Sequence, residues 1–83
     1  MKIVFSHYAF QKLEKLDKNL QARILQKLRF YSTQRDSLKF AKHLRDRKLG
    51  QFSFRIGDYR VMFDCGENKI LVVDVDRRDK VYR

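Results

Sequence analysis

The spacing of apolar residues predicts a strand followed by two helices in the first part of the chain. Lys2 to Phe5 is a short apolar stretch typical of a strand. From His7 onward apolar residues recur at intervals of three and four, and this helical stripe resumes after Asp17. Ser6 and Asp17 stand where N-caps are expected, so two helices with almost no loop between them are predicted.

The last third of the chain changes to a period of two, which predicts β-structure. Apolar and polar residues alternate from Phe52 to Asp64 around Gly57-Asp58, and glycine at the first central position is what a type II′ hairpin turn requires. A turn at Gly66 to Asn68 leads into Lys69 to Val75, which is apolar enough for a central strand. The elements predict an α+β fold with an N-terminal strand, a two-helix hairpin and an antiparallel three-stranded meander, the helices packed on one sheet face.

The alternation divides the hairpin side chains between two faces. The helices are expected to cover the face that carries Phe52, Phe54, Ile56, Tyr59, Val61 and Phe63. The opposite face, expected to stay open, carries Ser53, Arg55, Arg60 and Met62.

Closure of the hairpin at Gly57-Asp58 would place Arg55 directly opposite Arg60. Like charges in such a cross-strand pair cost some tenths to about 1 kcal/mol. The carboxylates of Asp64 and Asp74 could offset this repulsion, and Asp74 is expected near Arg60 on the open face. The interpretation we favour is an anion site, because a phosphate between two guanidinium groups turns repulsion into attraction.

Composition and charge narrow the class of protein. The 83 residues fit a single domain over 1–83, and 43% hydrophobic residues suffice for a core. Twenty Lys and Arg against ten Asp and Glu give a formal net charge of +10, which favours nucleic acid or an acidic protein as partner over a membrane. One cysteine allows no disulfide framework, and the first ten residues read as neither signal peptide nor membrane span. A cytoplasmic protein is therefore expected.

Basic residues gather on both sides of the predicted meander. Candidate RNA-binding residues are Lys39, Lys42, Arg45, Arg47 and Lys48 before it and Arg77, Lys80 and Arg83 after it. Arg78 and Tyr82 lie in the same tail, where Tyr82 offers a ring for base stacking and a phenol for proton transfer. Basic strands with an interleaved aromatic residue are typical of RNA binding. No histidine pair has metal-ligand spacing, so no metal or cofactor is expected.

Four segments resemble the RelE/ParE superfamily of toxins from toxin–antitoxin systems, over nearly the whole chain. They are "LEKLDKNLQARILQKL", "KHLRD", "FSFRIGDYRVMF" and "VDVDRRDKVYR". The resemblance implies a small α+β toxin held inactive by an antitoxin. RelE-like members enter the ribosomal A site and cut mRNA there, whereas ParE-like members poison DNA gyrase.

The resemblance also implies which residues do the chemistry. RelE-like nucleases use basic residues and a C-terminal Tyr or His, without a metal. Arg60 matches the Arg of the family's "GYR" segment, and Arg55 matches a basic residue on the preceding strand. Arg78 and Tyr82 match the tail motif. These four are therefore the candidate catalytic residues, with Lys42 as a second candidate for proton transfer.

Three residues depart from the pattern of the active nucleases. Ser53 stands where some active members carry a second Lys, Arg77 where many have His, and Asp76 where Gly is usual. The leading hypothesis is a ribosome-dependent mRNA endoribonuclease that acts by 2′-hydroxyl attack. The alternatives are a gyrase-inhibiting toxin of the same fold, or an inactive relative that binds RNA or antitoxin. The expected partners are a cognate acidic antitoxin, the ribosome and mRNA, with a monomeric free toxin and larger assemblies formed with the antitoxin.

Overall fold

Both helices begin at the capping residues that the sequence predicts. In the computed structural model, which describes residues 1–46, 48 and 50–77, the Ser6 side chain accepts a hydrogen bond from the backbone N–H of Ala9 at 3.1 Å. The Asp17 carboxylate accepts from the N–H groups of Asn19 and Leu20 at 2.8 and 3.2 Å. The elements are β1 (Lys2–Phe5), α1 (His7–Glu14), α2 (Lys18–Thr33), the 3₁₀ helix η1 (Ser37–Phe40), β2 (Lys42–His43), β3 (Phe52–Ile56), β4 (Tyr59–Gly66) and β5 (Lys69–Arg77).

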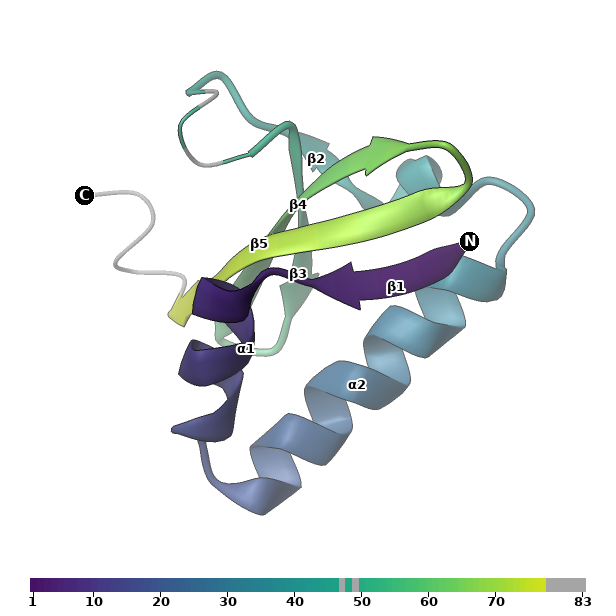
Figure 1. Cartoon of the computed structure of the whole chain (residues 1–83). Helices are drawn as coiled ribbons and strands as arrows, with labels where there is room; N and C mark the ends of the chain where they lie inside the picture. Colours follow the sequence, from purple (N-terminus) through teal and green to yellow (C-terminus); the bar gives the residue numbers. More distant parts are fainter. Residues whose placement is uncertain (47, 49, 78–83) are drawn as a thin grey trace.

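The strands form one mixed sheet in the order β1-β5-β4-β3-β2 (Figure 1). The predicted meander is β3–β4–β5, and its antiparallel pairing is confirmed. The N-terminal strand β1 pairs parallel to β5 at the sheet edge, a position that the alternation alone does not determine. Strand β2 lies in a basic stretch without periodicity, so sequence analysis did not predict it.

Positive φ angles at both turns of the meander account for its register. Gly57 has φ 60° as the first central residue of the β3–β4 turn, as a type II′ turn requires. Glu67 and Asn68 have φ 47° and 60° in the β4–β5 turn, which is the pattern of a type I′ turn. The first turn pairs Arg55 with Arg60, so the predicted cross-strand arginine pair is confirmed.

A β-bulge between Met62 and Phe63 changes what lies opposite Arg60. The bulge makes Asp76 the partner of Arg60 across β4 and β5, while Asp74 lies opposite Met62. The expected neighbour Asp74 is therefore one position away along the same face. An extra residue of this kind cannot be deduced from alternation, since β5 is apolar on both sides before it.

The core lies between the helices and one sheet face, called here the helix face. Ala9 and Leu13 of α1 and Ile24 and Leu28 of α2 are buried there. The buried sheet residues against them are Phe54, Ile56, Val61, Phe63, Ile70, Val72 and Val75. This arrangement confirms the predicted helix-covered face, and Figure 1 shows α2 crossing below the sheet. Within the described part of the chain, no helix is long and apolar enough to cross a membrane.

The other side, called here the far face, is less open than predicted. It carries Lys42, Ser53, Arg55, Arg60, Met62, Asp74 and Asp76. Of the four residues expected to be open, only Arg55 is exposed, and Ser53, Arg60 and Met62 are buried. The chain before β3 contributes to this cover, because a Cβ on Gly50 would lie 3.2 Å from Val73 Cγ2. Gly50 has φ 114°, so glycine suits this close approach in both space and conformation.

Candidate nucleic-acid interface

The arginine pair sits in the middle of the far face with unequal exposure. Arg55 on β3 is exposed and forms no ion pair with any residue that the structure describes. Arg60 on β4 is 7% exposed and lies between Arg55 on one side and Asp76 on the other. Asp76 therefore offsets part of the repulsion that the pair creates. Arg55 is the member of the pair that presents its charge to solvent.

The far face is polarised across its strands. A second cross-strand row runs from Lys42 on β2 through Ser53 and Met62 to Asp74 on β5. The cations thus lie towards β2, β3 and β4, and the carboxylates lie on β5. The Ser53 hydroxyl is buried with no hydrogen-bond partner in the described structure, so this position supplies no charge to the row.

Lys12 of α1 neutralises the acidic side of the far face. Its ammonium lies 2.8 Å from Asp74 Oδ1 and 3.1 Å from Asp76 Oδ2. Partial burial by itself lowers the pKa of Lys12, but the hydrogen bonds to the two carboxylates outweigh it and raise the pKa above the ordinary value of 10.5. The single positive charge of Lys12 offsets about one of the two negative charges that Asp74 and Asp76 place on this side of the face. Sequence analysis missed this residue, which is one of many lysines and lies 62 positions before Asp74 in the chain.

We expect Lys12→Met to cost about 1 kcal/mol of stability at neutral pH, because two neighbouring carboxylates lose their shared cation. A group whose pKa is raised on folding stabilises the protein below its unfolded pKa and loses that effect as the pH rises through its folded pKa. The difference in free energy of unfolding between wild type and variant should therefore be present at pH 7 and should disappear above about pH 10.5. Urea unfolding at both pH values measures it. Lys15→Met is the control, and an equal loss there would contradict a specific role of Lys12.

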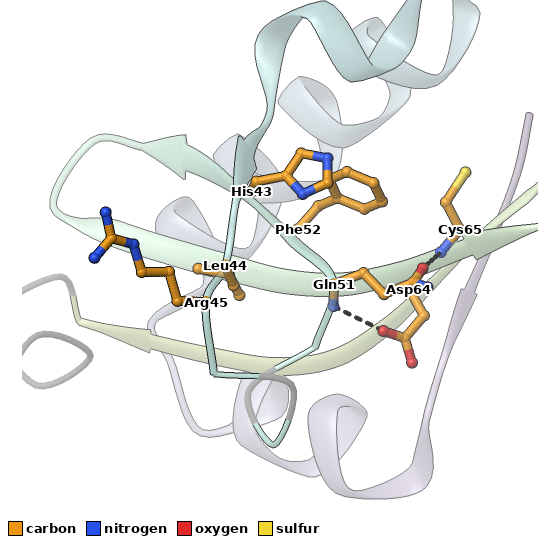
Figure 2. Close-up of a pocket in the computed structure, with 7 residues that line it drawn as sticks. All are labelled: His43, Leu44, Arg45, Gln51, Phe52, Asp64 and Cys65. Atoms are coloured by element: carbon orange, nitrogen blue, oxygen red, sulfur yellow. Dashed lines mark hydrogen bonds between the residues drawn. The ribbon is translucent and has the colours of Figure 1, made fainter.

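A pocket of about 570 Å³ lies beside the β2–β3 edge of the sheet, lined by His43, Leu44, Arg45, Gln51, Phe52, Asp64 and Cys65. Figure 2 shows the His43 ring against Phe52, where the ring centroids are 4.5 Å apart and meet edge to face. Gln51 is bound to β4 on the opposite side of the pocket. Its backbone N–H donates to the Asp64 carboxylate at 2.9 Å, and its side-chain oxygen accepts from the Cys65 N–H at 3.0 Å. Arg45 points away from Asp64 in Figure 2, so these two charges do not neutralise each other.

The predicted basic residues do not all meet on the far face. Lys42 does, and Arg45 lines the pocket next to β2. Lys39 lies in η1, which packs against α2, and Arg77 pairs with Tyr59 on the helix face. Lys48 is exposed in the segment between β2 and β3. Arg47, Arg78, Lys80, Tyr82 and Arg83 lie outside the described residues.

No metal centre is evident in the described ranges 1–46, 48 and 50–77. In these ranges no three His, Cys, Asp or Glu side chains gather in a way that would hold a metal ion. The acidic pair Asp74 and Asp76 is occupied by Lys12 instead.

Two helices on one face of a mixed five-stranded sheet, with paired arginines on the other face, define a RelE-like α+β domain. The family model described as ParE toxin of type II toxin–antitoxin system, parDE, matches residues 3–82, and the chain belongs to this family. The protein is thus a type II toxin of the RelE/ParE superfamily, as the sequence resemblance indicates.

A solved structure supports the same assignment. The chain is similar to one in the crystal structure of the toxin–antitoxin complex RelBE2 from Mycobacterium tuberculosis, with a TM-score of 0.75 and 28% identity. The match covers 93% of this chain and 96% of the other. A search of the curated proteins finds no match.

Proposed function

We propose that this toxin is a ribosome-dependent endoribonuclease that inhibits translation by cutting mRNA in the A site. The observation that carries the proposal is the Arg55–Arg60 pair, in which an exposed guanidinium stands beside a second, largely buried one. Lys42 adds a third cation on the same face, and Lys12 holds the nearby carboxylates. A dianionic phosphate species is the ligand that such a group of cations suits.

The chemistry needs only groups that the RNA and these side chains supply. The 2′-oxygen attacks the adjacent phosphorus, the bond to the 5′-oxygen breaks, and a 2′,3′-cyclic phosphate remains on one fragment. A base takes the 2′-hydroxyl proton, and an acid returns a proton to the leaving 5′-oxygen. Arg55 and Arg60 stabilise the phosphorane between these events. By resemblance, Arg78 neutralises the leaving side, and Tyr82 or Lys42 transfers a proton.

Orientation on the ribosome supplies much of the rate in this proposal. A tyrosine phenol in water has a pKa near 10 and is a weak base at neutral pH, so Tyr82 would need nearby cations to serve as the base. A bound mRNA held with its 2′-oxygen in line with the phosphorus needs less help from a base, because the geometry is already reached. Free RNA lacks that orientation and should be cut far more slowly.

A gyrase-inhibiting toxin is the second candidate, and two observations favour it. The matching family model carries the ParE description, and Ser53, which stands where some active nucleases have Lys, is buried without a charge. Such a toxin would use its basic surface to hold gyrase or gyrase-bound DNA. Lys42, Arg55 and Arg60 would then serve binding and not cleavage.

A translation extract separates the two candidates. Purified toxin is added with and without ribosomes, and the 5′ ends of the mRNA are mapped. Cuts restricted to A-site codons, absent without ribosomes, are the expected result. Intact mRNA together with trapped gyrase–DNA complexes would replace the proposal by the gyrase function. Intact mRNA, free gyrase and normal growth on induction would identify an inactive relative.

We further propose that a cognate acidic antitoxin controls the toxin and that the free toxin is a monomer. The similar chain belongs to the toxin–antitoxin complex RelBE2, which supports such a partner. The formal charge of +10 supports an acidic one, because opposite charge speeds association. Larger assemblies would then form with the antitoxin, and the ribosome and mRNA would be the partners of the released toxin.

A further inference from the structure

Three large apolar side chains are exposed together where α2 ends and η1 follows. Phe30 on α2 is 50% exposed, and Leu38 and Phe40 on η1 are 37% and 45% exposed. The ring centroids of Phe30 and Phe40 are 6.1 Å apart, so these two side chains form one surface, and Leu38 lies two positions before Phe40 on η1. The three residues are called here the aromatic patch. Single exposed apolar residues are common in folded proteins, but a contiguous group marks a contact site.

The aromatic patch rests on the core and is held in place by it. Phe40 stacks on Tyr31 with centroids 5.2 Å apart, and Tyr31 stacks on the buried Phe54 at 4.5 Å. Phe54 in turn stacks on the buried Phe63 at 4.4 Å. A surface whose rings are fixed before binding loses little conformational freedom when a partner covers it, which favours affinity.

The surroundings of the patch are basic. Residues 27–40 carry four cations, namely Lys27, Arg29, Arg35 and Lys39, against the single carboxylate of Asp36. All four cations are exposed, and the Lys27 ammonium lies 5.9 Å from the centre of the Phe30 ring. An apolar surface carried by a segment with four exposed cations is complementary to a partner segment that carries apolar and acidic side chains.

We propose that the aromatic patch is a docking surface for an amphipathic acidic segment of the antitoxin. The proposal rests on the antitoxin partner proposed above and names where on the toxin it binds. In it Lys39, which lies away from the arginine pair, contacts a carboxylate of the antitoxin and not RNA. A second copy of the chain fits poorly, because each copy carries a formal charge of +10.

RNA fits this surface less well than a protein segment does. Tyr31 already covers one face of the Phe40 ring, and Phe30 meets Phe40 edge to face. Leu38 offers no aromatic face for a base to stack on, but it packs well against an aliphatic side chain. The patch therefore favours aliphatic side chains that pack over its exposed apolar surface.

The test measures binding of the antitoxin encoded by the neighbouring reading frame, by titration calorimetry. Phe30→Gln replaces an exposed ring by a good helix former and should weaken binding at least about tenfold, as truncation of a central aromatic contact does. Tyr8→Gln is the matched control, since Tyr8 is 58% exposed and lies on α1, which adjoins the start of α2 and not the end that carries the patch (Figure 1), and it should change affinity less than about threefold. Circular dichroism confirms that both variants are folded.

A charge reversal provides a second, independent variant. Lys39→Glu should slow association several-fold at low salt and have little effect near 1 M salt, where the Debye length is about 3 Å. Phe30→Gln should raise the dissociation rate at every salt concentration, because apolar contacts are not screened. Lys18→Glu at the start of α2 is the charge control, and an equal effect there would overturn the role of the patch.

The toxicity of the variants separates this proposal from the proposed cleavage activity. In cells, Phe30→Gln should still arrest growth but should no longer be rescued fully by the antitoxin, whatever the target of the toxin. Unchanged antitoxin affinity of Phe30→Gln would overturn the docking surface while leaving the cleavage proposal intact. Two other results, each with antitoxin affinity unchanged, would assign the patch to a different partner. If Phe30→Gln loses binding to a 12-nucleotide RNA, the patch binds RNA. If the variant loses self-association in sedimentation, the patch binds a second copy of the chain.

Discussion

Replacing Arg60 by alanine is expected to abolish toxicity and to cost about 1–3 kcal/mol of stability. The functional loss follows from the place of Arg60 beside Arg55, where two guanidinium groups meet the phosphate in the proposed reaction. The stability loss follows from its burial, because at 7% exposure its removal leaves space and takes away a cation beside Asp76, which is left to share Lys12 with Asp74. Growth on induction and urea unfolding measure the two effects separately.

Two further variants at the arginine pair separate charge from geometry. Arg55→Ala removes an exposed side chain and should change stability by no more than about 0.5 kcal/mol while lowering toxicity strongly. Arg60→Lys keeps the charge but loses the two-pronged donor geometry, so intermediate toxicity is expected. A folded Arg60→Ala protein that still arrests growth would contradict any role of this pair in binding phosphate.

The hairpin was predictable from sequence because its signals are local. Glycine at the first central position fixes the turn, the turn fixes the pairing, and the pairing puts Arg55 opposite Arg60. The bulge after Met62 is different, since nothing in an apolar run marks which residue will be left out of the ladder. Continued without that extra residue, the ladder that begins at Gly66 and Lys69 would place Val75 opposite Arg60, so the bulge is what brings Asp76 beside Arg60.

The openness of the far face could not be predicted from the period of two. Alternation states which side chains share a face, but it does not state what else packs there. Gly50 approaches the far face through a non-periodic stretch, and Lys12 reaches Asp74 and Asp76 from a helix far away in the sequence. Long-range contacts of this kind depend on the arrangement of the elements in space.

The basic residues show the same limit for the candidate site. Composition predicted a cationic surface, but it could not sort Lys42 from Lys39, which are only three positions apart in the chain. A short strand carries Lys42 to the far face, whereas η1 holds Lys39 against α2. Resemblance to a family identifies the motif residues. Which side chains form a binding surface depends on how the elements pack, and the sequence alone does not show this.

Phe54→Ala is expected to remove about 3–5 kcal/mol of stability, the largest loss among the substitutions considered. Phe54 is fully buried and stacks between Tyr31 and Phe63, with centroid distances of 4.5 and 4.4 Å. A domain of 83 residues has a total stability of only about 4–12 kcal/mol, so this variant should be close to unfolding. Thermal unfolding followed by circular dichroism should show a midpoint lower by about 15 °C or more.

Phe40→Ala is the control at the exposed end of the same aromatic stack. Phe40 is 45% exposed and contacts Tyr31 from the outside, so its loss should cost less than about 1.5 kcal/mol. Equal losses for Phe40→Ala and Phe54→Ala would mean that the aromatic patch is part of the core and not a surface that rests on it. A small loss at Phe40 beside a large one at Phe54 would mean that the toxin can lose its outer rings and stay folded, which is what a surface kept for a partner requires.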